Sequence, residues 1–134
     1  MAKLNKKILI AEDDKNLLSA LQEKFTNEGF SVVSALDGEE GLVVAKKEKP
    51  DLLLIDIRMP KIDGITMARK LKEDGIDAPI IFLTNLDDVK HISDAIAVSK
   101  SDYLIKSDWK LEDIVKKVKV KLGQLEVGEH SEED

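Results

Sequence analysis

The 134-residue sequence contains no cysteine, only three prolines and few aromatic residues (4%). The absence of cysteine excludes a disulfide framework, a thiolate metal site and a cysteine nucleophile, and it fits a reducing compartment, so we expect a cytoplasmic protein. Its longest apolar runs, such as residues 52–55, are too short to span a bilayer, and we expect no membrane insertion. The basic start is followed by an apolar stretch of only residues 8–11, so we expect no signal peptide.

The sequence also lacks an excess of positive charge. It has 21 Lys and Arg against 27 Asp and Glu, a formal net charge of -6, which disfavours direct nucleic-acid binding. Residues 126–134 hold five acids and no base, so residues 1–125 are nearly balanced, with 22 acids against 21 bases. We therefore expect one domain over residues 1–125, followed by a flexible acidic tail over 126–134.

Short apolar runs alternate with helical patterns along the whole domain. Hydrophobic residues make up 43% of the chain, enough for a sizeable core. The runs at 8–11, 30–35, 52–55, 79–84 and 102–105 are typical of strands buried on both faces. Apolar spacing predicts helices after each strand, over 14–28, 37–49, 65–74, 87–98 and 111–125. Five strands and five helices in strict alternation indicate a doubly wound parallel α/β sheet.

Polar side chains follow several of these strands where function is expected in a parallel sheet. Glu12 and Asp13 follow the first strand, Asp56 ends the third, Thr84 ends the fourth and Lys106 follows the fifth. Clustered carboxylates repel one another, so the site needs a cation, and oxygen ligands with room for water favour Mg²⁺. No Cys or His lies near these positions, which disfavours zinc. A carboxylate beside Mg²⁺, an ammonium and a hydroxyl indicates phosphoryl transfer with an Asp nucleophile.

Simpler structural roles are open to some of these residues. Asp14 is expected to cap the first helix, and Asp13 taken alone could do the same. Asp56 alone could form a turn before Pro60, although a carboxylate that ends the most apolar strand favours a functional role. Gly41 falls inside the second predicted helix, where glycine costs about 0.5–1 kcal/mol relative to alanine.

The sequence resembles the receiver domain of response regulators, of the CheY-like kind. The resemblance covers about residues 6–125 and rests on four blocks that occur in order. It implies a flavodoxin-like (βα)5 fold with the strand order 2-1-3-4-5. The blocks are Ile8-Leu9-Ile10-Ala11-Glu12-Asp13-Asp14; residues 51–60 with Asp63-Gly64; residues 79–84, which end in Leu83-Thr84; and Tyr103-Leu104-Ile105-Lys106.

The resemblance also implies a role for each matching residue. The phosphoryl group would come from a histidine kinase or a phosphotransfer protein, with Mg²⁺ or Mn²⁺ as cofactor. Asp13 would bind the ion directly and Glu12 through water. The implied site residues are Asp56 as phosphoacceptor; Glu12, Asp13, Asp56 and the backbone carbonyl of Arg58 at the metal; and Thr84, Lys106 and the aromatic switch residue Tyr103 at the phosphoryl group.

Output in this family implies a protein partner on the face formed by the fourth helix, fifth strand and fifth helix. Dimerisation on activation, or a region outside this sequence, is an alternative route. The chain would catalyse only its own phosphorylation and dephosphorylation, without turnover of another substrate.

Two competing functions stay open. A degenerate receiver would bind partners without phosphorylation, although such proteins usually lose an acid or the lysine. A phosphohydrolase with an aspartyl nucleophile usually has an acid two residues later, where this chain has Arg58.

The chain departs from the family at Asn85, where a small residue is usual, and at Ser107, where proline is usual. A cis bond before a non-proline residue costs about 3 kcal/mol, so we expect a trans bond between Lys106 and Ser107.

Overall fold

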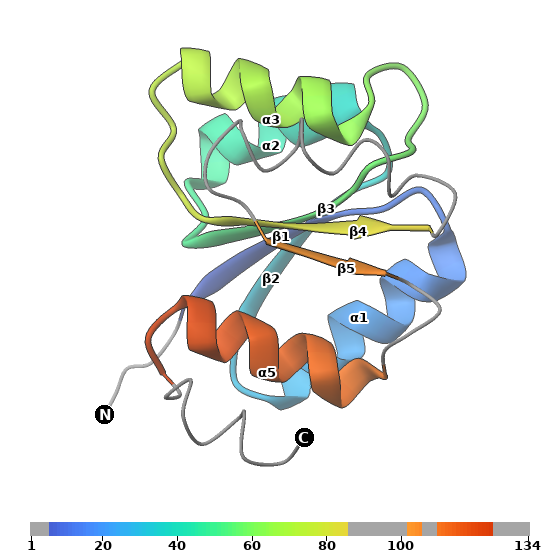
Figure 1. Cartoon of the computed structure of the whole chain (residues 1–134), viewed down its shortest axis with the longest axis vertical. Helices are drawn as coiled ribbons and strands as arrows, with labels where there is room; N and C mark the ends of the chain where they lie inside the picture. Colours follow the sequence, from blue (N-terminus) through green and yellow to red (C-terminus); the bar gives the residue numbers. More distant parts are fainter. Residues whose placement is uncertain (1–5, 86–101, 106–109, 125–134) are drawn as a thin grey trace.

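The computed structural model describes residues 6–85, 102–105 and 110–124, and within these ranges it is a parallel sheet covered by helices on both faces (Figure 1). The sheet has five strands in the order β2-β1-β3-β4-β5, which confirms the predicted fold class and strand order. The elements are β1 (Lys7–Ala11), α1 (Lys15–Asn27), β2 (Ser31–Ala35), α2 (Gly38–Glu48), β3 (Leu52–Asp56), α3 (Gly64–Glu73), β4 (Ile80–Thr84), β5 (Asp102–Ile105) and α5 (Leu111–Lys121).

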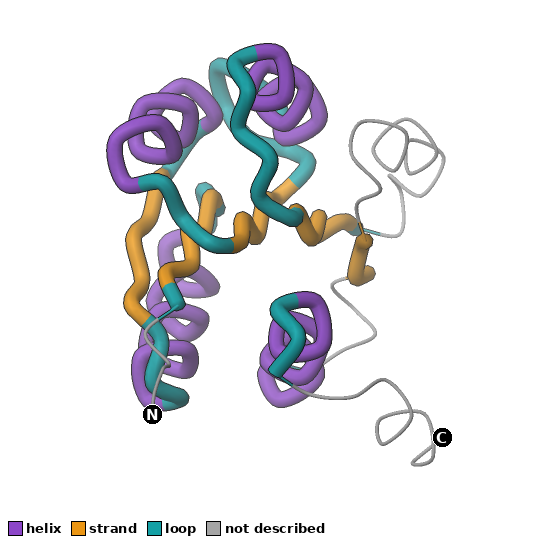
Figure 2. The backbone as a smooth tube through the Cα atoms, turned by 90° about the vertical axis from the view of Figure 1, so that its left-hand side faces the viewer, coloured by secondary structure: helices purple, strands orange, loops and turns teal. Residues whose placement is uncertain are grey.

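The two faces of the sheet are buried by different helices. Figure 1 shows α2 and α3 above the sheet and α1 and α5 below it, and Figure 2 shows the same layers from the side. Side chains alternate along a strand, so Ile8 and Ile10 of β1 pack with α1 and α5, whereas Leu9 and Ala11 pack with α2 and α3. This double burial explains why β3 and β4 are apolar runs without a polar face.

Aspartates begin three of the helices. The carboxylate of Asp14 accepts hydrogen bonds from the amides of Asn16 and Leu17, which confirms its predicted role as a cap. Asp37 caps α2 and Asp63 caps α3 in the same way. In each case the side chain satisfies amides that the first helical turn leaves without a backbone partner.

Two details differ from the sequence-based expectations. The last helix ends at Lys121 rather than at residue 125, because Gly123 adopts a left-handed backbone (φ 78°) that ends the helix. Gly41 is also more than a weak helix former. A Cβ atom added there would lie 2.7 Å from Cε of the fully buried Met67, so the flexible end of that side chain would have to shift to admit alanine.

Several predictions lie outside the described residues. They are the helix over 87–98, the trans bond between Lys106 and Ser107, and the acidic tail over 126–134. Among the helices of the described ranges, none is long and apolar enough to cross a membrane.

A charged contact joins the ends of α1 and α5. Glu28 accepts a hydrogen bond from Lys119 at 3.0 Å, and Lys24 lies 3.5 Å from its other carboxylate oxygen. The hydrogen bond from Lys119, helped by the charges of Lys119 and Lys24, lowers the pKa of Glu28 below its usual 4.5, against a smaller opposing effect of burial. Since the folded pKa is depressed, the contact stabilises the fold above about pH 4.5 and loses this effect as the pH falls through the folded pKa.

We expect the substitution Glu28→Gln to lower the free energy of unfolding by up to about 1 kcal/mol at pH 7. The difference from the wild type should vanish in acid, where Glu28 is protonated in both the folded and the unfolded state. Urea unfolding at a series of pH values measures this. Glu23→Gln, at an exposed position of the same helix, is the control, and an equal loss in both variants would contradict the assignment.

Candidate functional site

The site begins where β1 runs into α1. The amide of Glu12 donates to the carbonyl of Ala35 at 3.0 Å, which extends the strand pairing by one residue. The amide of Asp14 donates to Oε2 of Glu12 at 3.0 Å and so holds the Glu12 carboxylate against the connection. Because Asp14 already begins the helix, Glu12 and Asp13 are fixed in a two-residue link at the carboxyl end of the strand.

Asp56 is brought to the same level by the register of the sheet. Ala11 of β1 pairs with Ile55 of β3, so the residues that follow each of them, Glu12 and Asp56, are neighbours. The amide of Arg58 donates to Oδ1 of Asp56 at 3.3 Å, which orients the Asp56 carboxylate at the start of the β3–α3 loop. We call residues 57–63 the acceptor loop, because this loop follows Asp56 directly.

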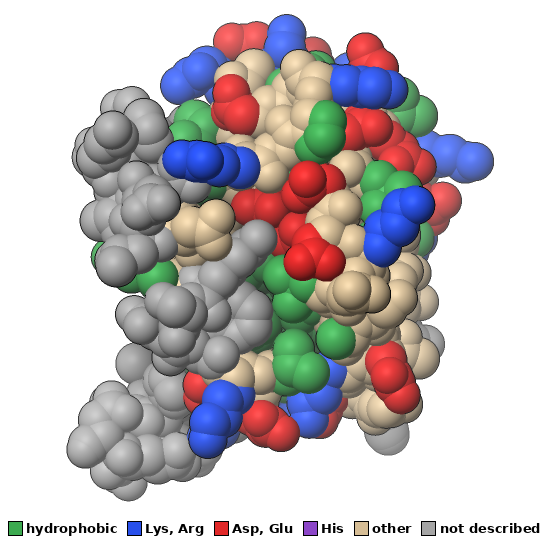
Figure 3. Space-filling view, turned by 90° about the vertical axis from the view of Figure 1, so that its right-hand side faces the viewer, with side chains coloured by type: hydrophobic (Ala, Val, Ile, Leu, Met, Phe, Trp, Pro, Cys, Tyr) green, Lys and Arg blue, Asp and Glu red, His purple; other side chains and the backbone are tan. Residues whose placement is uncertain are grey.

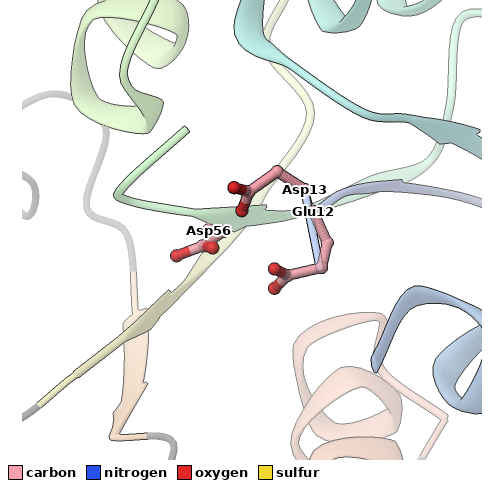
Figure 4. A group of neighbouring side chains, drawn as sticks. All are labelled: Glu12, Asp13 and Asp56. Atoms are coloured by element: carbon pink, nitrogen blue, oxygen red, sulfur yellow. The ribbon is translucent and has the colours of Figure 1, made fainter. Parts of the chain in front are cut away.

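The three carboxylates form one cluster, shown in Figure 4. One ligand oxygen from each of Glu12, Asp13 and Asp56 lies within 4.8 Å of the others. Glu12 is fully buried, Asp56 is 4% exposed and Asp13 is exposed, so the cluster opens to solvent on one side. Figure 3 views this edge of the sheet and shows acidic side chains gathered near the middle of the face.

The cluster has the chemistry of a site for a hard cation. Two carboxylates out of bulk water and a third close by repel one another, and this repulsion is stronger where water is excluded. Carboxylate oxygens at this spacing can share one divalent ion, and the exposed side leaves room for its water ligands. The predicted convergence of Glu12, Asp13 and Asp56 is therefore present in the structure.

Thr84 and Tyr103 lie on the neighbouring strands. Thr84 ends β4, is fully buried, and its hydroxyl donates to the carbonyl of Asn85 at 3.1 Å. Tyr103 lies on β5 and pairs with Phe82 of β4, two residues before the level of Thr84. Its side chain is 38% exposed. The structure thus places Thr84 on the strand next to Asp56 and Tyr103 at the outer strand. Lys106 lies outside the described residues.

Gly64 also belongs to the site, although the sequence pattern predicts it only as part of a loop. A Cβ atom added to Gly64 would lie 2.3 Å from the carbonyl oxygen of Asp56 and 2.8 Å from Cγ2 of Ile55. The amide of Gly64 donates to the carbonyl of Ile57 at 2.8 Å. Only glycine lets the start of α3 pack directly on the backbone of Asp56, and the signal available in the sequence was the pair Asp63-Gly64 just before a helix.

Comparison with known proteins gives a consistent result. Residues 8–119 match the family model of the response regulator receiver domain. The chain is 33% identical over 130 residues to the alkaline phosphatase synthesis transcriptional regulatory protein PhoP of Bacillus subtilis, covering 97% of this chain and 54% of that protein. It is 33% identical over 116 residues to the response regulator MprA of Mycobacterium leprae, covering 87% and 50%. The chain thus spans about half the length of these curated relatives.

Solved structures agree with the sequence relatives. The receiver domain of the Francisella response regulator 1452 superposes with a TM-score of 0.82 at 29% identity, covering 90% of this chain and 98% of that one. A chain of the CheX–CheY–BeF3–Mg²⁺ complex of Borrelia burgdorferi superposes with a TM-score of 0.76 at 28% identity, covering 85% and 87%.

The carboxylate cluster generates a prediction about stability. Without divalent cations, Asp13→Asn should raise the free energy of unfolding by on the order of 1 kcal/mol, because one of three repelling charges is removed. The same variant should lose most of the stabilisation that Mg²⁺ gives the wild type. Thermal unfolding in EDTA and in a Mg²⁺ series measures both effects.

Asp14→Asn is the matched control for this experiment. It removes the same charge from the next position and keeps a good helix cap. It should therefore respond to Mg²⁺ like the wild type. Equal responses of Asp13→Asn and the wild type to Mg²⁺ would remove Asp13 from the metal site.

Proposed function

Because the chain belongs to the response regulator receiver-domain family, we propose that it is the phosphorylatable receiver of a two-component phosphorelay, with Asp56 as the phosphoacceptor. The observation that carries the proposal is the carboxylate cluster at the carboxyl edge of the sheet. Asp56 ends the central strand β3, lies 4% exposed, and faces Glu12 and Asp13 within 4.8 Å (Figure 4). A buried acid with two acidic neighbours suits phosphoryl transfer better than a structural role.

Mg²⁺ or Mn²⁺ is the proposed cofactor. Asp13 and Asp56 would bind the ion directly, Glu12 through water, and the Arg58 carbonyl would add a backbone ligand. The all-oxygen donor set and the open side of the cluster support this choice. The ion would supply neutralisation of the negative charge on the phosphoryl oxygens.

The chain's own residues carry the transfer. A carboxylate oxygen of Asp56 attacks the phosphorus of the donor, so that a P–O bond forms as the P–N bond of a phosphohistidine breaks. The amide of Arg58, 3.3 Å from Oδ1 of Asp56, holds the carboxylate in orientation. Thr84 would turn its hydroxyl from the carbonyl of Asn85 to a phosphoryl oxygen, and Lys106 would pair with the phosphoryl group from the other side.

The proposed reaction implies protein partners and a cellular compartment. The donor would be a histidine kinase or a phosphotransfer protein in the cytoplasm, where donors made from ATP are found. Tyr103 would move inward as Thr84 shifts, and the change on β5 and the adjoining helices would alter binding of a downstream protein or a second copy of the chain. The protein would catalyse only its own phosphorylation and dephosphorylation, and it would act on nucleic acid only through a partner or a region outside this sequence.

The direct test is phosphorylation by a small donor. We expect the wild type to gain one phosphoryl group by mass spectrometry when it is incubated with acetyl phosphate and Mg²⁺. Asp56→Asn should gain none, because the amide is not a nucleophile for this reaction. EDTA should abolish the gain on the wild type.

Asp63→Asn is the matched control for Asp56→Asn. Asp63 caps α3 at the end of the same loop, and asparagine is a comparable cap. This variant should therefore be phosphorylated. No mass gain on the wild type with acetyl phosphate or with a phosphorylated histidine protein would favour the degenerate receiver, and a gain that survives Asp56→Asn would move the acceptor to another residue.

A further inference from the structure

The start of α2 touches the acceptor loop so closely that only a glycine fits. A Cβ atom added to Gly38 would lie 2.0 Å from the carbonyl oxygen of Ile62 and 2.8 Å from its carbonyl carbon. Both are backbone atoms, so the overlap cannot be relieved by a rotation of a side chain. Alanine at position 38 therefore requires a shift of the loop backbone or of the helix.

Backbone conformation does not explain this glycine. The described glycines with positive φ are Gly29, Gly75 and Gly123, whereas Gly38 is in the regular start of a helix. Glycine in a helix is less favourable than alanine by up to about 1 kcal/mol. Within the described part of the chain, the close approach of the acceptor loop accounts for glycine at this position.

Further contacts join the same two segments. The carbonyl of Pro60 accepts a long hydrogen bond from the amide of Gly38 at 3.5 Å. Lys61, whose backbone is left-handed (φ 71°), places its ammonium 3.7 Å from Asp37 and 3.7 Å from Glu39. The middle of the acceptor loop thus rests on the beginning of α2.

The acceptor loop is fixed at its ends by other contacts. The amide of Ile57 donates to the carbonyl of Leu83, and the amide of Gly64 donates to the carbonyl of Ile57. Arg58 lies in the chain between the anchored Ile57 and Ile62, so the position of its carbonyl depends on the conformation of the loop. A displaced Ile62 would turn the peptide units that lead back to Arg58.

We infer that Gly38 is a positioning residue for the metal site, acting through the acceptor loop that carries the Arg58 carbonyl. The inference rests on the proposed function, since it assumes that this carbonyl binds Mg²⁺. Gly38 itself is not among the residues assigned to the ion or to the phosphoryl group. It is a second point of support for the site, from a helix that contributes no ligand.

The test compares Gly38→Ala with Gly41→Ala in the full chain. Both changes add one methyl group to the same helix, but the one at position 41 overlaps with the end of the flexible Met67 side chain and otherwise makes only an ordinary contact with Ala35. Isothermal titration with Mg²⁺ should show about ten-fold weaker binding for Gly38→Ala and no change for Gly41→Ala. With acetyl phosphate, Gly38→Ala should need more Mg²⁺ for half-maximal rate and approach the wild-type rate at saturation.

A second variant pair keeps the test decisive if Gly38→Ala folds poorly. Glycine accepts the left-handed backbone of Lys61 without strain, so Lys61→Gly gives the loop freedom to yield to the added methyl group. Gly38→Ala/Lys61→Gly should then fold, as judged by cooperative urea unfolding. It should still bind Mg²⁺ about ten-fold more weakly than Lys61→Gly alone.

The outcomes separate the inference from the proposed function. Wild-type protein that neither binds Mg²⁺ nor is phosphorylated would overturn the proposed function. If the wild type does both, the positioning role alone can still be overturned. This would be the outcome if folded Gly38→Ala binds Mg²⁺ as tightly as the wild type, or if the folded double variant binds it as tightly as Lys61→Gly. Equal weakening in Gly41→Ala would also overturn it, because a general effect of packing at α2 would then explain the result.

Discussion

Repulsion among three carboxylates at one edge of a parallel sheet is the constraint around which this protein is built. Glu12 and Asp56 are buried, Asp13 lies at the opening, and a ligand oxygen of each is within 4.8 Å of the others. Buried like charges destabilise a fold unless a cation or hydrogen bonds compensate. The sheet can hold them because β1 and β3 are locked in register by apolar side chains on both faces. The stable core thus supports a locally unfavourable site, as is common where function requires charge.

At the opposite edge of the sheet, two acidic side chains form ion pairs with lysines. Lys7 donates to Glu48 at 2.9 Å, and Lys72 donates to Asp77 at 2.6 Å. These hydrogen bonds lower the pKa of Glu48 and of Asp77, with the lysine charges acting in the same direction. Lysine ammonium groups thus pair with these two acids near the amino ends of the strands, and among the described residues three acids gather at the carboxyl edge.

Much of the fold and part of the site could be predicted from the sequence. Apolar runs and helical spacing define local elements, and strict alternation leaves one common architecture, so the parallel sheet follows. The convergence of Glu12, Asp13 and Asp56 follows in turn, because strand ends of a parallel sheet meet at one edge. The cap at Asp14 could also be predicted, since a helix start is a local property of the chain.

The contacts of the glycines could not be predicted in the same way. Gly38, Gly41 and Gly64 are all in helices, and helix propensity alone scores each as a small loss. Their importance comes from contacts with other segments: Gly38 meets the backbone of Ile62, Gly41 the side chain of Met67, and Gly64 the backbone of Asp56 on the preceding strand. Such distances depend on how deeply helices pack, which no local pattern encodes. The end of α5 is the opposite case: the apolar stripe predicts a helix to residue 125, whereas Gly123, a local stop signal with a left-handed backbone, ends it earlier.

The repeated pair Asp-Gly combines a helix start that is predictable from the local sequence with a close tertiary contact that is not. Asp37-Gly38 and Asp63-Gly64 both begin helices, and in both the aspartate caps the helix while the glycine admits a passing backbone. One backbone is that of the acceptor loop and the other is that of Asp56 itself, so both helix starts border the candidate site. A cap followed by glycine thus does two things at once: it fixes where the helix begins and lets that beginning approach another chain segment. In this protein the two close approaches place the starts of α2 and α3, which supply none of the three clustered carboxylates, against the acceptor loop and the backbone of Asp56.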